Sequence, residues 1–181
     1  MRIISGKLKS YRFQPPKGFP SRPTTDFAKE ALFNVLENRI SLIDLEILDL
    51  FSGTGNISFE FASRNAGKIT AVDSNFKSVR FINEMTVKYK IDDVVTAIKN
   101  DAVKFVLKTA KTYDIIFADP PFDKPVHQDV INAVFEKDCL KKEGILIIEH
   151  SKRTQLSEHP QHRETRKYGN VCFSFFSKDN E

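Results

Sequence analysis

The chain lacks several features that mark particular classes of protein. It has no tryptophan and two cysteines, and Cys139 and Cys172 lie far apart in the sequence without metal-ligand spacing. We expect both to be reduced, cytosolic residues that fill apolar space. The four histidines form no recognisable ligand pattern either. These absences argue against a disulfide-rich domain and predict that the protein holds no metal.

Long apolar runs are also missing. None approaches the roughly 18 residues that a membrane-spanning helix needs, and residues 1–6 lack the apolar core of a signal peptide. At 181 residues the chain fits one domain, 1–181, that is long enough for a sizeable core. We therefore expect a cytoplasmic globular protein with no membrane partner.

Charge is present but unevenly distributed. Residues 1–22 contain six basic side chains and no acid, and residues 151–170 carry a net +3. Because the whole chain carries +4, the remainder sums to −5. A basic segment beside an acidic body favours a polyanion such as nucleic acid as the partner. The alternative is a basic N-terminus that is merely solvated.

The N-terminal segment has the pattern of a β-hairpin. Two short strand-like pieces, 2–4 and 11–13, flank a polar stretch that suits a turn, and a proline-rich link follows. A helix is then expected from Thr25 or Asp26 to about residue 39. Arg22 and Thr24 would lie at its N-terminus, where backbone N–H groups favour anions. They would either contact a phosphate or serve ordinary helix capping.

Apolar runs and helical patterns alternate along the rest of the chain. Strands are predicted at 46–51, 68–72, 94–98, 115–118, 145–150 and 171–176. Helices are predicted at about 57–64, 75–90, 102–110 and 128–136. This alternation is typical of an α/β fold with a mostly parallel sheet and helices on both faces. In such sheets ligands bind outside the carboxyl ends of the strands.

The strand at 46–51 runs into a loop with two closely spaced glycines. Gly53 and Gly55 permit a tight turn and a close approach of the backbone to a ligand. Asp73 follows the next strand, 20 positions after Gly53, near the spacing at which a carboxylate binds ribose hydroxyls. Asp101 ends the third strand and would either accept from an adenine amino group or cap a helix. Together these residues predict an adenosine-containing cofactor.

The loop departs from the dinucleotide pattern in one respect. The third glycine of G-x-G-x-x-G would fall at Ser58 and is absent. A nucleoside without a pyrophosphate fits better, and S-adenosylmethionine is such a ligand. Its positive sulfonium suits a crevice in the negatively charged body of the chain.

A stiff turn is predicted at the end of the strand at 115–118. There the chain reads Asp119, Pro120, Pro121 and Phe122. Each proline disfavours helical geometry in the residue before it, so this corner is extended. It offers a carboxylate and a backbone carbonyl as acceptors and an aromatic face for stacking, which suits a planar ring with an exocyclic amine. The alternative is a strand-ending turn with a surface acid.

Several motifs resemble one known family. Residues 47–55 look like the first motif of class I methyltransferases, and residues 119–122 look like the signature of enzymes that methylate amino nitrogens. Further motifs, spread over essentially the whole chain, resemble the bacterial RsmD family of 16S ribosomal RNA guanine-N2 methyltransferases. They lie at residues 1–6, 22–26, 30–34, 148–150 and 167–169.

The resemblance implies a Rossmann-like, mostly parallel seven-stranded sheet with an N-terminal β-hairpin extension at 1–22 for RNA binding. It implies methyl transfer from S-adenosylmethionine to a guanine of 16S rRNA, in the small subunit or its assembly intermediate. The expected catalytic residues are Asp119, Pro120, Pro121 and Phe122. The expected cofactor-binding residues are Asp49, Phe51, Gly53, Gly55, Asp73, Asp101 and Ala102. The expected RNA-binding residues are Arg2, Lys7, Lys9, Arg12, Arg22 and Thr24.

The chain departs from the family pattern at three positions, and two rival functions remain open. Phe122 stands where many relatives have tyrosine, Ser52 replaces a common alanine, and Phe27 replaces a residue that is often basic. An adenine-N6 or cytosine-N4 methyltransferase uses a similar turn, although the chain has no separate domain for reading DNA sequence. A non-catalytic RNA-binding relative is the second alternative.

Overall fold

The chain folds around one seven-stranded sheet. The structure is a computed structural model that describes residues 1–15, 19, 25–121 and 125–178. The strand order is β3-β2-β1-β4-β5-β7-β6, in which β1 to β5 pair in parallel and β7 is antiparallel to both β5 and β6. The strands are β1 Glu46–Leu50, β2 Lys68–Asp73, β3 Val95–Lys99, β4 Tyr113–Ala118, β5 Leu140–Ser151, β6 His162–Tyr168 and β7 Val171–Phe176.

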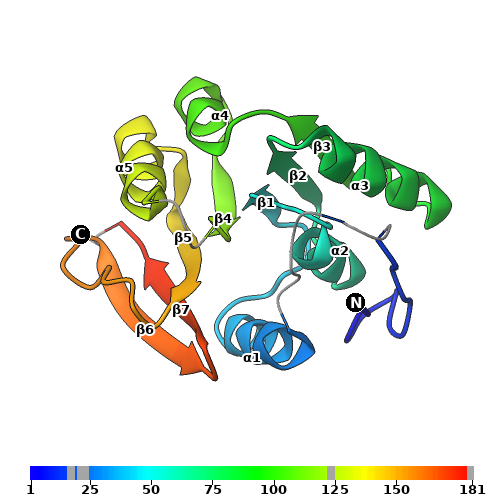
Figure 1. Cartoon of the computed structure of the whole chain (residues 1–181), viewed down its shortest axis with the longest axis horizontal. Coiled ribbons are helices and arrows are strands. Elements are labelled where there is room, and N and C mark those ends of the chain that lie inside the picture. Colours follow the sequence, from blue (N-terminus) through cyan, green and yellow to red (C-terminus); the bar gives the residue numbers. More distant parts are fainter. Residues whose placement is uncertain (16–18, 20–24, 122–124, 179–181) are drawn as a thin grey trace.

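Helices cover both faces of the sheet (Figure 1). They are α1 Asp26–Glu37, α2 Asn56–Ser63, α3 Phe76–Lys88, α4 Ala102–Lys108 and α5 His127–Lys137. One apolar cluster packs α1, α2 and α3 against one face, and a second packs α4 and α5 against the other. Alternate residues of a strand point to opposite faces, so Ile47 joins the first cluster and Leu48 the second. The central strands are buried on both sides for this reason.

The predicted fold class is confirmed, and six of the seven strands fall where the apolar runs predicted them. The seventh, β6, was not predicted from its own residues because 162–168 contains no aliphatic side chain. β5 also begins earlier than expected, at Leu140, before the polar residues 141–143. Within the described part of the chain, no helix has the length and apolarity to cross a membrane. Cys139 and Cys172 are buried and unbridged, as expected.

Capping side chains begin three of the helices. The Thr25 hydroxyl accepts from the backbone N–H of Ala28 at 3.2 Å, which settles the start of α1. Asn75 caps α3 in the same manner. Asp101 caps α4, accepting from the Lys104 N–H at 3.0 Å. Each cap satisfies a backbone donor that the first turn of a helix leaves unpaired.

Residues 1–13 of the N-terminal extension form a hairpin with very little β-structure. Its two arms pair through the backbone of Ile3 with Tyr11 and Ser10, and a single antiparallel bridge joins Arg2 to Arg12. Its apolar side chains anchor it to the domain, because Ile3, Leu8 and Phe13 are buried in the first core cluster. The Phe13 ring stacks on Phe59 of α2 with centroids 4.5 Å apart. The extension is therefore part of the core, not a free arm.

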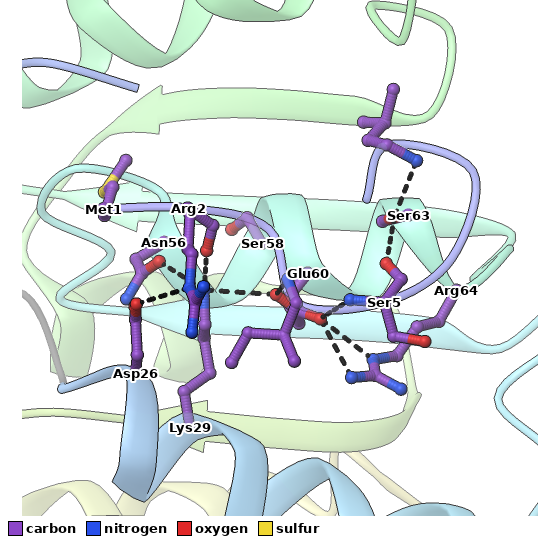
Figure 2. Close-up of polar contacts among 12 residues, drawn as sticks. Met1, Arg2, Ser5, Asp26, Lys29, Asn56, Ser58, Glu60, Ser63 and Arg64 are labelled. Atoms are coloured by element: carbon purple, nitrogen blue, oxygen red, sulfur yellow. Dashed lines mark hydrogen bonds and ion pairs between the residues drawn. The ribbon is translucent and has the colours of Figure 1, made fainter. Parts of the chain in front are cut away.

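A buried carboxylate holds the extension against α2 (Figure 2). Glu60 accepts from the backbone N–H groups of Ile4 at 3.0 Å and Ser5 at 3.1 Å. Its charge is balanced by the Lys29 ammonium, 3.1 Å away, and by the Arg64 guanidinium, 2.9 Å away. Because neither Glu60 nor Lys29 is exposed, water cannot replace either partner.

Lys29 extends this network toward the glycine loop. Its ammonium donates to the Arg2 carbonyl at 2.6 Å and to Asn56 Oδ1 at 2.8 Å. Asn56 is the first residue of α2, directly after Gly55. Burial lowers the pKa of Lys29, and the carboxylate of Glu60 opposes that shift. One ammonium thus joins α1, the extension and the start of α2.

The first prediction concerns this ammonium. Lys29→Met keeps the length of the side chain but leaves Glu60 with less charge compensation in an apolar setting. We expect the free energy of unfolding to fall by about 3 kcal/mol, measured by urea denaturation. The control is Arg80→Met, which breaks an exposed pair with Glu84 on α3 and should cost no more than about 1 kcal/mol. Equal losses in the two variants would contradict the role given to Lys29.

Candidate active site

Four strand ends meet at one edge of the sheet. Leu50 of β1 lies in register with Val72 of β2 and with Ala118 of β4, and Asp73 lies in register with Lys99 of β3. Because these strands are parallel, the residues that follow them emerge on the same side. The glycine loop, Asp73, Asp101 and Asp119 are thus brought to a common edge, as the sequence predicted.

The glycine loop is fixed by the neighbouring strand. Phe51, Gly53 and Gly55 all have positive φ, at 59°, 51° and 73°. That conformation is costly for a residue with a side chain, so Phe51 marks a strained point in the loop. The Gly53 N–H donates to Asp73 Oδ2 at 2.8 Å, and the Asn75 N–H donates to Asp73 Oδ1 at 2.7 Å. Each carboxylate oxygen retains a lone pair for a ligand hydroxyl.

Asp49 lies beneath this loop. It is 1% exposed, and its carboxylate accepts from the Ser58 backbone N–H at 3.1 Å and from the Ser58 hydroxyl at 2.5 Å. Burial raises the pKa of Asp49 to about 7, against the two hydrogen bonds from Ser58, which lower it. The carboxylate therefore orders the first turn of α2. Asp49 would influence a ligand only indirectly, by fixing the position of the glycine loop.

Asp119 stands at the end of β4, beside the loop. Its N–H donates to the Leu50 carbonyl at 3.3 Å, and its side chain is half-buried. Burial raises the pKa of Asp119 well above its ordinary value, and the nearby carboxylates of Glu149 and Asp49 raise it further. This carboxylate is consequently a stronger proton acceptor than a surface aspartate.

The rest of the proline turn is described only in part. Pro120 is buried and Pro121 is exposed. Phe122, the predicted stacking residue, lies outside the described residues, so its placement stays a prediction.

Two further features bear on a cofactor. The Ser52 hydroxyl is buried in the glycine loop and has no hydrogen-bond partner among the described residues, which leaves it available to a polar ligand. Asp101 is exposed at the end of β3 and caps α4, so its position is as predicted while one oxygen is already engaged. Ala102, the first residue of α4, is buried beside it.

The predicted RNA-binding residues gather on the extension. Arg2, Lys7, Lys9 and Arg12 are exposed, and Arg2 pairs with Asp26 of α1 at 2.8 Å. Arg22 and Thr24 fall outside the described residues, and their roles remain predictions. Among the residues that the structure places, no three His, Cys, Asp or Glu side chains are grouped to hold a metal ion.

The strand order, the antiparallel β7 and the glycine loop after β1 define a class I methyltransferase. The model of a family described as "Conserved hypothetical protein 95" matches residues 1–177. The chain belongs to this family, the RsmD family of methyltransferases.

Individual proteins show the same relationship. The chain is 33% identical over 149 residues to "Ribosomal RNA small subunit methyltransferase D" of Buchnera aphidicola subsp. Baizongia pistaciae, covering 82% of this chain and 75% of that protein. Its fold is similar to "Putative methyltransferase yhhF" from Escherichia coli, with a TM-score of 0.85, 23% identity, and coverage of 100% and 99% of the two chains. It is also similar to a T. thermophilus 16S rRNA N2 methyltransferase in complex with AdoMet and guanosine, with a TM-score of 0.73, 21% identity, and coverage of 90% and 46%.

Two residues at this edge were not assigned a role from the sequence. Ser52 was noted only as a replacement for a common alanine. Glu149 follows the apolar part of β5 and is 3% exposed. Its carboxylate lies close enough to Asp119 to raise the pKa of that side chain. An acid at the end of the fifth apolar run could have drawn attention to Glu149. Nothing local marks the Ser52 hydroxyl as unpartnered.

The second prediction follows from the raised pKa of Asp49. Because this pKa is 3.8 in the unfolded chain and about 7 in the folded one, the folded state binds the proton more tightly. The free energy of unfolding should therefore fall as pH rises between those values, by up to about 1.4 kcal/mol per pH unit for one carboxyl. Asp49→Asn should flatten that slope, measured by urea denaturation at several pH values.

Ser58→Ala provides the matched comparison. It removes a hydrogen bond that lowers the Asp49 pKa, so the descending limb should extend to higher pH. A slope in Asp49→Asn that equals the wild-type slope would show that this carboxyl does not titrate in the window.

Proposed function

We propose that this protein transfers a methyl group from S-adenosylmethionine to the exocyclic N2 of a guanine in 16S rRNA of the small ribosomal subunit or its assembly intermediate. The observation that carries the proposal is the position of the Asp119–Pro120 corner, which lies one strand from the Gly53–Asp73 contact at the same sheet edge. Family membership supports it, since a 33% identical relative is named as a ribosomal RNA small subunit methyltransferase.

The described residues fit S-adenosylmethionine. Asp73 has lone pairs free for ribose hydroxyls, and Gly53 and Gly55 let the backbone lie close to the ligand. The orphaned Ser52 hydroxyl suits the polar amino-acid end of the cofactor. Asp101 would reach the adenine amine with its remaining oxygen. When bound, the cofactor supplies an electrophilic methyl group on a sulfonium, whose positive charge the acids at this edge would stabilise.

Asp119 and Pro120 would hold the amine of the base. The lone pair of the guanine N2 is delocalised into the ring, so the free amine is a poor nucleophile. Hydrogen bonds to the Asp119 carboxylate and the Pro120 carbonyl would orient the amine with its lone pair directed toward the methyl group. Positioning of this kind removes much of the entropic barrier. The raised pKa of Asp119 also makes its carboxylate a suitable acceptor for the proton that the amine loses.

The base must leave its stack before it can reach this corner. Extruding a nucleotide costs a few kcal/mol of stacking and pairing energy. An aromatic face offsets part of that cost, and Phe122 is the residue that we propose for this contact. Arg2, Lys7, Lys9 and Arg12 would bind the RNA backbone on the exposed side of the extension.

The third prediction tests Asp119. Asp119→Ala should lower methyl transfer to unmethylated small subunits by about 100-fold or more, because the amine loses its orienting acceptor. The dissociation constant of the cofactor, measured by calorimetry, should change little. Asp119→Asn keeps an acceptor oxygen and should retain more activity than the alanine variant. An equal loss of cofactor binding and transfer would contradict the role of Asp119.

The fourth prediction tests the extension. Deleting residues 1–15 would remove Phe13 from the core and expose Phe59, on which it stacks, so exposed charges are the better target. The combined change Lys7→Ala, Lys9→Ala and Arg12→Ala should weaken RNA binding. The slope of log affinity against log salt should fall by about 0.7–0.9 for each phosphate that the variant no longer neutralises.

The control replaces Lys108 and Lys111 with alanine. Both are exposed, and they lie at the amino end of β4, opposite the active-site edge. RNA affinity and its salt slope should then match the wild type. If both sets of substitutions have the same effect, the extension is not the RNA-binding surface.

A further inference from the structure

A surface groove runs between α1 and β6, outside the site described above. It has a volume of about 400 Å³. One wall is a face of α1 together with its C-cap residue Asn38, and on the helix it is formed by Ala31, Asn34 and Val35, which recur at helical spacing. The other wall is the side of β6 that carries Arg166 and Tyr168. Figure 1 shows α1 beside the end of β6.

One end of the groove lies at the active-site edge of the sheet. Tyr168 ends β6 in register with Val171 of β7, and Val171 pairs with Ser151 at the carboxyl end of β5. α1 begins at the same edge, because Lys29 in its first turn contacts Asn56 at the start of α2. This end of the groove therefore lies on the side of the molecule where Asp119 stands.

An exposed aromatic pair lies at this end of the groove, where Tyr168 belongs to the lining and Phe27 contacts it from outside the lining. Phe27, in the first turn of α1, is 67% exposed, the largest fraction among the large apolar side chains that the structure describes. Its ring meets Tyr168 edge-on, with centroids 6.4 Å apart. Tyr168 is itself supported from below by Phe173. Apart from this edge contact the ring buries little apolar surface in the fold, and its exposed part can stack against a planar ligand.

The groove also carries the groups that a nucleotide needs. Arg39 and Arg166 lie on it, and both contact Glu164, which holds their guanidinium groups in place. A guanidinium has five N–H donors, more than these contacts use. The amides of Asn34 and Asn38 are exposed and can both donate to and accept from a base edge. Two cations against one acid favour a polyanion over an apolar peptide.

We propose that this groove binds a nucleotide of the substrate RNA next to the methylated guanine, with its base stacked on Phe27. The proposal rests on the proposed function, because it concerns the nucleotide next to the guanine whose amine Asp119 would bind. It also gives a role to position 27, where phenylalanine stands in place of a residue that is often basic in relatives. Phe27 acts by stacking, so a charge is not required.

The first test compares two truncations of exposed apolar side chains. Phe27→Ala should weaken binding to unmethylated small ribosomal subunits by about fivefold or more, the effect of removing one base–aromatic stack. Phe27→Tyr keeps the ring and should restore the affinity. Val87→Ala is the control, since Val87 is 65% exposed on α3, away from this groove. Cofactor affinity should be unchanged in all three variants.

The second test identifies the occupant. Replacement of Phe27 by p-benzoylphenylalanine permits photocrosslinking to whatever the ring touches. The crosslink should map to a nucleotide adjacent to the methylated guanine, while the same replacement at Val87 should give no such product. A crosslink to a ribosomal protein or to distant RNA would overturn the proposal, as would an affinity of Phe27→Ala within twofold of the wild type.

The two proposals can fail separately. Mass spectrometry of RNA treated with the wild-type protein shows whether a guanine N2 becomes methylated, whatever Phe27 does. A methylated guanine with no effect of Phe27→Ala would overturn only the groove. Absence of methylation by the wild-type protein would overturn the proposed function.

Discussion

The parallel ladder on either side of β1 is the constraint on which the site depends. Pairing of Leu50 with Val72 and with Ala118 brings three strand ends level at one edge. Only then can the Gly53 N–H reach the Asp73 carboxylate, and only then does the Asp119 backbone reach the Leu50 carbonyl. A shift of one residue in either pairing would exchange the two faces of the shifted strand, so side chains that fit one apolar cluster would have to pack into the other. The core therefore enforces the register that the chemistry needs.

The extension depends on the core in a different way. A hairpin with one bridge has little stability alone, and it is the burial of Ile3, Leu8 and Phe13 and the carboxylate of Glu60 that give it a fixed position. Because Lys29 joins this carboxylate to Asn56, the basic surface and the glycine loop share one rigid support. In the proposed function, RNA held by the extension would thus keep a defined distance from the cofactor loop.

Much of this arrangement was predictable from the residues, and what was missed has identifiable causes. Strands that are buried on both faces have nearly continuous apolar runs in the sequence. β1, β2 and β4 could therefore be located from these runs, and their ends could be assigned to a site. β6 is an edge strand with polar residues on both faces, and its sequence has no apolar run to detect. The Lys29–Glu60 pair joins residues 31 positions apart, and each alone resembles a solvated charge on a helix. Burial of such a pair is a property of the packing, which no local pattern contains.

The two substrates of the proposed reaction make opposite electrostatic demands, and the fold separates them. A sulfonium is stabilised by carboxylates, and those of Glu149 and Asp49 lie close enough to Asp119 to raise its pKa, as Asp73 and Glu149 do for Asp49. RNA is repelled by the same charges and needs the cations of the extension. A reacting base is nearly uncharged, so it alone can cross from the basic surface into the acidic edge. Extrusion of the base would then satisfy electrostatics as well as access, because the phosphates remain outside.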